Sequence, residues 1–267
     1  MGTIVVMAVL VAVASAARST YSPCGLSMLS TVTPMAESAR GHRYATTATF
    51  FWLGAVLGGA TLGLGAAALA AFVSLFGLTG TAAVGAAGLA AVGALALDAG
   101  LVGPPIPHHR RQVNEDWLGR YRSWVYGGGF GWQIGTGLAT YIMTAGVYLV
   151  IALAALTGSP AVAMGLCVLF GALRGSAVLL GARLTDADAL RRFHERFDAL
   201  REPIRRVVMV VEALVAAIAA AVAGAPAGIV VGVALAVCGV AAVVVTVRQS
   251  RTGDASTAAV PATVDLR

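Results

Sequence analysis

The stretch YSPCGLSMLSTVTP, from Tyr21 to Pro34, interrupts the apolar beginning of this chain with two prolines, a glycine, a cysteine and five serine or threonine residues. Each proline removes a backbone donor and kinks a helix, and glycine allows a sharp bend. At membrane depth, irregular backbone is tolerated only inside protein or along a water-filled cavity. The stretch therefore predicts a broken helix beside a substrate pathway, with a structural kink around an inert cysteine as the alternative. The expected lining residues are Pro23, Gly25, Ser27, Thr31 and Pro34.

The composition around this stretch is that of a membrane protein. The 267-residue chain is 58% hydrophobic and 11% charged, whereas an ordinary soluble domain has about 25% charged residues. Long apolar runs recur along it, which predicts an all-α, multi-pass protein with the lipid bilayer as its first partner. Seven spans are expected, over residues 4–34, 46–74, 78–101, 126–156, 160–182, 207–223 and 226–247.

The arginines predict the orientation of these spans. All 18 basic residues are arginine and the net charge is +6. Sixteen of them follow spans one, three, five or seven, while the connections after spans two, four and six carry no charge. The positive-inside rule then places the N-terminus outside the cell membrane and the C-terminus in the cytoplasm. The same rule explains the positive charge without nucleic acid as a partner.

The ends of the chain and its longest charged loop lead to further expectations. One transmembrane domain is expected over residues 1–247, followed by a disordered cytoplasmic tail over 248–267. Residues 14–16 read ASA, like a signal cleavage site, so a cleaved signal peptide over residues 1–17 is the alternative to a retained first span; no basic region precedes the apolar run, which favours retention. Before span six, leucine and phenylalanine recur at helical spacing, at Leu190, Phe193, Phe197 and Leu200. This pattern predicts an amphipathic helix, either on the membrane surface or solvated between two spans.

The chain also contains an internal repeat. SPCGLSMLSTVTP matches IGTGLATYIMTAG, so that Cys24 falls on Thr136, Gly25 on Gly137 and Pro34 on Gly146. LGAVLGGA, from Leu53, similarly matches FGALRGSA, from Phe170, and both contain small-xxx-small pairs suited to close helix packing. The chain then divides into halves over 1–101 and 126–223, with an extra helix over 226–247. Three spans per half make the halves inverted, which is the plan of many transporters.

The repeat adds a second set of candidate site residues, and three charged residues lie inside predicted spans. Arg174 and Glu212 are expected at similar depth, as an ion pair that fixes two helices, or with Arg174 serving an anionic ligand or gate. No metal, cofactor or enzyme motif is expected, because the histidines His42, His108, His109 and His194 lie in loops without ligand spacing. The second pathway segment is Gln133, Gly135, Thr136, Gly137 and Thr140, and the intramembrane charges are Arg18, Arg174 and Glu212.

The SPCG…P element resembles the CcdA/DsbD-type cytochrome c biogenesis transmembrane family, within the lysine-exporter-like superfamily. The resemblance implies the inverted-repeat fold and makes Cys24 one member of a redox pair that carries reducing equivalents across the membrane. Thr136 stands where the second motif of that family has its cysteine. Thiol–disulfide exchange needs a second sulfur, and Cys167 or Cys238 could supply it only if the fold brings one close.

Three functions follow from these observations. The first is a transporter-like membrane protein, of unknown substrate, with a central site between the broken helices of the two repeats. The second is a transmembrane thiol–disulfide reductant carrier, which would need a thiol-protein partner. The third is a non-catalytic membrane scaffold that binds another protein through its basic cytoplasmic face.

Overall fold

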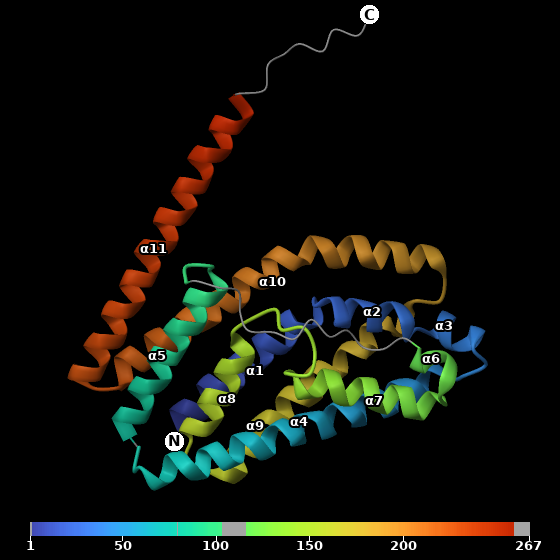
Figure 1. The fold of residues 1–267 in the computed structure, drawn as a ribbon, viewed down its shortest axis with the longest axis horizontal. Coiled ribbons are helices and arrows are strands. Elements are labelled where there is room, and N and C mark those ends of the chain that lie inside the picture. Colours follow the sequence, from blue (N-terminus) through green and yellow to red (C-terminus); the bar gives the residue numbers. More distant parts are fainter. Residues whose placement is uncertain (1, 79, 103–115, 259–267) are drawn as a thin grey trace, which may run out of the picture.

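The computed structural model describes residues 2–78, 80–102 and 116–258, and within these ranges the chain forms helices and no strands (Figure 1). The expected all-α fold is therefore confirmed. In chain order the elements are α1 (Gly2–Thr20), α2 (Pro23–Thr31), α3 (Pro34–Ala39), α4 (Tyr44–Leu75), α5 (Gly80–Asp98), α6 (Trp117–Arg120), α7 (Ser123–Thr136), α8 (Gly146–Leu156), α9 (Pro160–Gly175), the 3-10 helix η1 (Ser176–Arg183), α10 (Ala187–Val222) and α11 (Ala225–Ala258).

Five stretches of helix in the described ranges are long and apolar enough to cross a membrane, which indicates a membrane protein. They are Gly2–Thr20, Tyr44–Leu75, Gly80–Asp98, Pro160–Arg183 and Ala225–Ala242. The two remaining predicted spans have a different form. Span four is divided into α7 and α8, and span six is the apolar end of the long, partly charged helix α10.

The first span is broken where its prolines and hydroxyl residues predict. α1 ends at Thr20, and the Ser22 hydroxyl caps α2 by accepting the Gly25 N–H at 3.1 Å. A second cap follows at Thr33, whose hydroxyl accepts the Ala36 N–H at 3.1 Å. In both caps the next residue is proline, at the first helical position, where its missing N–H costs no hydrogen bond.

The fourth span is broken at the corresponding place. α7 ends at Thr136, and Gly137 adopts a positive φ of +75°, which glycine tolerates without strain. The chain is then irregular until α8 begins at Gly146. A side chain at Gly146 would overlap the hydroxyl of Ser15 in α1. The second break therefore lies directly against the helix that leads into the first.

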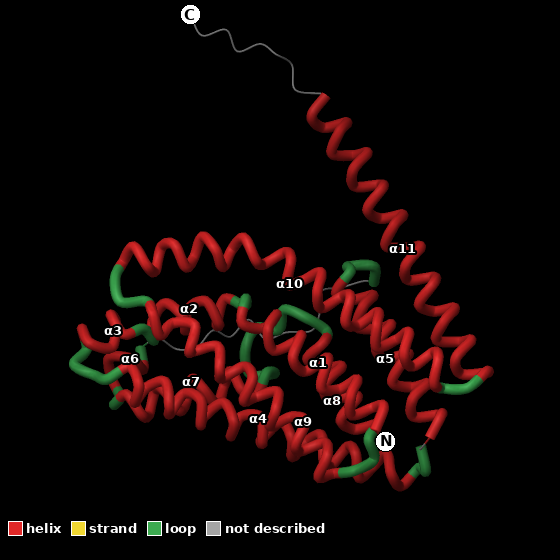
Figure 2. The backbone as a smooth tube through the Cα atoms, turned by 180° about the vertical axis from the view of Figure 1, so that it is seen from behind, coloured by secondary structure: helices red, strands yellow, loops and turns green. Residues whose placement is uncertain are grey.

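The helices of the two predicted halves pack on one another in pairs: α1 on α8, α4 on α9 and α5 on α10. α4 packs on both α7 and α9, and the three helices lie together along the lower side of the molecule in Figure 2. Glycines make this packing close. A Cβ atom at Gly171 would lie 2.7 Å from the Gly59 Cα, and Cβ atoms at Gly54 and Gly58 would overlap backbone carbonyls of α7. The expected close packing through small residues is confirmed, with Gly54 and Gly58 facing α7.

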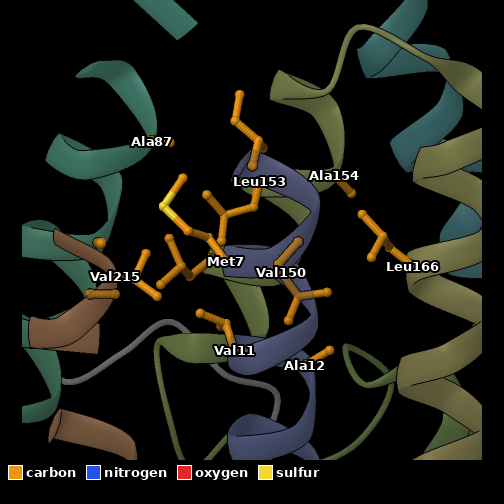
Figure 3. Close-up of a cluster of buried hydrophobic side chains, with 14 of the residues drawn as sticks. Met7, Val11, Ala12, Ala87, Val150, Leu153, Ala154, Leu166 and Val215 are labelled. Carbon is orange, nitrogen blue, oxygen red and sulfur yellow. The ribbon is translucent and has the colours of Figure 1, made fainter. Parts of the chain in front are cut away.

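The apolar core surrounds α1. Figure 3 shows Met7 and Val11 of α1 meeting Val150 and Leu153 of α8, with Val215 of α10 on the other side. All five side chains are at most 1% exposed. α1 is thus a central helix, and the polar residues near its C-terminal end lie inside the protein rather than at its edge.

The charged loop before span six is the first half of α10, and part of its apolar face packs on protein. Phe197 is 4% exposed and stacks on Tyr21 with ring centroids 4.0 Å apart, and His194 lies within hydrogen-bond distance of the Ser30 hydroxyl, at 3.0 Å. The residues beside the first break cover Phe197, whereas Leu200 of the same face is exposed, so the two expectations for this face, lipid and solvent, stay predictions for its uncovered part. The expectation that His194 lies in a loop is wrong, because it is part of helix α10 and contacts Ser30 of α2.

The last helix differs from the expected tail. α11 continues to Ala258, so residues 248–258 are helical rather than disordered, and residues 259–267 lie outside the described part. Beyond its contacts with α5 and α10, α11 projects away from the other helices (Figure 1). Its side chains at Ile229, Val233, Val237 and Val240 are exposed, as expected of a surface that faces lipid.

Candidate functional site

The two breaks meet at a buried arginine. Arg174 in α9 is 2% exposed, and its Nη1 lies close to Gly137, where a Cβ atom would be 3.4 Å away. The guanidinium carbon lies 5.7 Å from the centre of the Phe170 ring, and the guanidinium is within electrostatic range of Cys24 in α2. One residue of α9 thus lies beside Gly137 in the second break and near Cys24 in the first turn of α2, which follows the first break. This arrangement is here called the Arg174 site.

The guanidinium of Arg174 lacks the partners that a buried arginine requires. Its Nε and Nη1 are inaccessible to solvent and make no hydrogen bond to the protein. Buried charges are ordinarily paired, because desolvation is costly. Arginine presents a planar set of donors suited to carboxylates and other oxyanions. The Arg174 site therefore has the chemistry of an anion-binding group held inside the protein.

The expected ion pair between Arg174 and Glu212 does not form. Both carboxylate oxygens of Glu212 lack a hydrogen-bond donor among the described residues, and the carboxyl group lies against that of Asp98. The reason is orientation about the helix axes. α9 turns Arg174 toward the two breaks, whereas α10 turns Glu212 toward the end of α5.

Asp98 and Glu212 form a second polar centre, here called the carboxyl pair. Asp98 accepts hydrogen bonds from the Thr144 hydroxyl and, at 2.7 Å, from the Ala145 N–H, both in the break between α7 and α8. Glu212 is fully buried, while Asp98 keeps some exposure. The carboxyl pair thus ties α5 and α10 to the second broken helix.

Arg18 lies close to the carboxyl pair but does not bind it directly. It is 7% exposed, and its Nη1 donates to the Arg201 carbonyl at 3.2 Å. Its charge interacts with that of Asp98. Arg205 similarly donates to the main-chain carbonyl of Asp98 at 3.1 Å rather than to its carboxylate. Arg18 is therefore an interior residue that links α1 to α10.

The other predicted pathway residues differ in whether they lie at a break or are satisfied within their own helix. The hydroxyls of Thr31 and Thr136 bind carbonyls one turn earlier in their own helices, at 2.9 and 2.8 Å. Gly135 packs against the Ala55 carbonyl. Thr140, in contrast, is fully buried in the break and its hydroxyl has no partner. Of the second segment, Gly137 and Thr140 are therefore placed at the break itself. Pro23 and Pro34 begin helices, and Ser27 and Gln133 are half-buried.

Sequence reasoning did not single out Glu37, although it is fully buried in α3. Its carboxylate accepts hydrogen bonds from Thr47 at 2.5 Å, Tyr126 at 2.6 Å and Arg40 at 2.8 Å. It therefore joins α3, α4 and α7. In the sequence Glu37 follows the first predicted span and lies close to Arg40 and Arg43, as a charged loop residue would. Asp98, at the end of span three, was missed for the same reason.

The cysteines divide between two core clusters. Cys24 belongs to a cluster with Tyr21, Phe51 and Tyr126, whereas Cys167 and Cys238 belong to the cluster around α1. All three are buried and none forms a disulfide. No group of three or more histidine, cysteine or acidic side chains that could hold a metal occurs in the described ranges. His108 and His109 lie outside those ranges.

A more exposed rim of charges precedes the buried part of α10. Glu202 accepts hydrogen bonds from Arg205 at 3.0 and 3.1 Å and from Arg206 at 3.4 Å. The Arg205 hydrogen bond holds the pKa of Glu202 below its ordinary value and raises the pKa of Arg205. Arg205 therefore binds Glu202 rather than the side-chain carboxyl groups of Asp98 and Glu212.

In comparisons with known proteins, this chain is similar to one group of relatives, which share a name. The chain is 37% identical over 168 residues to the methylamine utilization protein MauF of Paracoccus versutus, covering 60% of this chain and 59% of the relative. It is 35% identical over 164 residues to MauF of Paracoccus denitrificans, covering 60% and 57%. For MauF of Methylorubrum extorquens the identity is 34% over 162 residues, covering 58% and 54%.

These matches are partial. No family model and no solved structure matches the chain. The chain spans less than three-fifths of the length of the curated relatives it matches. It is therefore similar, over about 60% of its own length, to proteins named for methylamine utilization.

Proposed function

We propose that this protein is a transporter-like membrane protein that holds a small anionic or polar solute where its two broken helices cross. The observation that carries the proposal is the buried guanidinium of Arg174, whose Nε and Nη1 have no hydrogen-bond partner and which lies beside Gly137 in one break and near Cys24 beside the other. An anion bound there would supply the hydrogen-bond acceptors that the protein does not.

The arrangement of the helices supports a transport mechanism. Many secondary transporters place substrate at the interface of two inverted repeats, between discontinuous helices. Here the helices that correspond in the two predicted halves pack on one another, α1 on α8, α4 on α9 and α5 on α10. Such pairing is expected of halves related by a two-fold axis. The resemblance to CcdA/DsbD-type proteins rests on the same plan.

The relatives point to the process that the protein serves. Because they are named for methylamine utilization, we assign this chain to the same process, as a membrane component rather than as an enzyme that acts on the amine. The solute carried would be one that methylamine growth requires.

Growth complementation tests this assignment. The full chain is expressed in a Paracoccus versutus strain that lacks its own MauF, with methylamine as the carbon source. The wild-type chain should restore growth and Arg174→Gln should not, at equal membrane levels by immunoblot. Arg191→Gln is the matched control, because that side chain is 70% exposed. If the wild-type chain failed to restore growth, the assignment to methylamine utilization would be rejected. If Arg174→Gln restored growth fully, the role of the Arg174 site would be rejected.

Ligand binding at the Arg174 site can be measured without transport. Purified protein in detergent is melted in the presence of formate, acetate or chloride as sodium salts. A ligand at 100 times its Kd stabilises the folded state by about 2.7 kcal/mol, so an anion that binds should raise the melting temperature of the wild type. Equal shifts in Arg174→Gln would show binding elsewhere and contradict the proposal.

A second candidate function is the transmembrane thiol carrier. Its support is the position of the buried Cys24 near the cation Arg174, together with the resemblance of the SPCG…P element to thiol-reductant membrane proteins. With Cys167 and Cys238 in another cluster, the resolving thiol would have to come from a partner protein. Cys24→Ser should then abolish complementation, and a mixed disulfide at Cys24 should be trapped. Full activity of Cys24→Ser would reject the thiol carrier and leave the solute transporter as the remaining proposal.

A further inference from the structure

The carboxyl pair of Asp98 and Glu212 places two acidic groups in contact inside the protein. Glu212 is fully buried and neither of its oxygens accepts a hydrogen bond from a donor group of the described residues. Its neighbour is the carboxyl group of Asp98. Two carboxylates that share a buried site do not both ionise readily, because their like charges repel and burial disfavours each charge. A proton between them relieves both costs.

The cations nearby do not replace that proton. Arg18 interacts electrostatically with Asp98, and its Nη1 donates to the Arg201 carbonyl. Arg205 binds Glu202 and the main-chain carbonyl of Asp98. Thr144 and Ala145 each donate to one oxygen of the Asp98 carboxylate, which leaves acceptor positions on Asp98 for a proton donated by Glu212. The oxygens of Glu212 thus face Asp98 without a cation in contact.

A separate feature marks this region as a site. The hydroxyl of Ser15 in α1 is fully buried and has no hydrogen-bond partner. It lies against Gly146, on the same side as the hydroxyl of Thr144, which binds Asp98. This buried hydroxyl is a further polar group without a partner, next to the Thr144 side chain that binds Asp98.

We infer that Asp98 and Glu212 form a proton-binding site that couples proton uptake to the position of the second broken helix. With one proton shared, Glu212–COOH donates to the Asp98 carboxylate, which keeps the Thr144 and Ala145 bonds. When the proton leaves to water through the partly exposed Asp98, two facing carboxylates remain and repel one another. The contact between α5 and the break at residues 137–145 then weakens. Its role in transport rests on the proposed function, but the proton site itself does not.

Infrared difference spectroscopy of the full-length protein in lipid nanodiscs tests the inference. Spectra are recorded over a pH series, and the stretching band of a protonated carboxyl group is followed. The wild type should show one such band that disappears as the pH rises, and Glu212→Gln should lose it. Asp98→Asn should lose it too, because the amide can donate to Glu212 without a proton. Glu202→Gln, at the exposed rim, should retain it.

Several results would overturn the proton site. They are a wild type without the band at any pH, a band with no pH dependence, and a band that survives in folded Glu212→Gln. The wild-type pH series needs no variant, so misfolding of a substitution does not obscure the result. Loss of the band when excess sodium chloride replaces choline chloride would show that a metal cation takes the site instead. A titrating band without complementation of growth would leave the proton site standing and remove only its transport role.

Discussion

At the scale of single residues, the buried polar groups of this protein differ sharply in how well they are satisfied. Glu37 accepts three side-chain hydrogen bonds, whereas Arg174 and Glu212 each lack partners. A buried polar group with a complete set of partners stabilises a fold, while one without them costs free energy. Glu37 is therefore assigned to structure, and the two unsatisfied residues to binding.

Substitution of Glu37 tests the structural half of this contrast. Glu37→Gln keeps the size of the side chain but turns donor hydrogens toward Arg40, Thr47 or Tyr126. We expect a loss of about 2–4 kcal/mol in unfolding free energy, visible as a lower melting temperature in detergent. Glu202→Gln, at a half-exposed side chain, should shift stability by no more than about 0.5 kcal/mol. Equal melting of both variants would contradict the structural role.

At the scale of elements, the glycines of α4, α7 and α9 set how closely these helices approach. A Cβ atom at Gly131 of α7 would overlap the Phe51 carbonyl of α4, whereas one at Gly165 of α9 would meet nothing within 4 Å. Gly131→Ala should therefore cost about 1–3 kcal/mol through overpacking. Gly165→Ala should be neutral or stabilising by up to about 1 kcal/mol. Thermal melting of both variants in one detergent checks the pair, and similar losses would show that close packing is not the cause.

The amphipathic half of α10 is the second element with a clear test. Phe197 stacks on Tyr21 beside the first break, while Leu200 is 49% exposed. Phe197→Ala should loosen α2 and increase hydrogen exchange of its amides, whereas Leu200→Ala should leave that exchange unchanged. If this half of α10 lay on the membrane surface instead, both substitutions would weaken membrane contact and neither would alter α2 selectively.

The breaks were predictable from sequence, but the contacts made across them were not. Proline, glycine and capping hydroxyls act within a few residues, so Ser22 and Pro23 mark a helix start without knowledge of the fold. The expected Arg174–Glu212 pair failed because similar depth does not fix the direction of a side chain about its helix axis. The contacts of Arg174 with Gly137 and Cys24 depend on how three helices are rotated, which hydrophobic patterning does not specify.

At the scale of the whole molecule, the uncharged connections gather at one end. The N-terminus and the turns from α4 to α5, α8 to α9 and α10 to α11 lie toward the lower left of Figure 1. The arginine-rich segments begin at the opposite ends of these helices, which is the distribution that the positive-inside rule relates to orientation. The predicted orientation thus assigns the uncharged end to the outside.

Labelling of single introduced cysteines tests this orientation. Ala161→Cys, at the exposed start of α9, should react with a membrane-impermeant maleimide on intact cells. Asp188→Cys, at the start of α10, should react only after the cells are permeabilised. The wild type provides the background, which should be low because Cys24, Cys167 and Cys238 are at most 7% exposed. The reverse pattern would invert the predicted orientation, and with it the side of the membrane toward which the Asp98 end of α5 points.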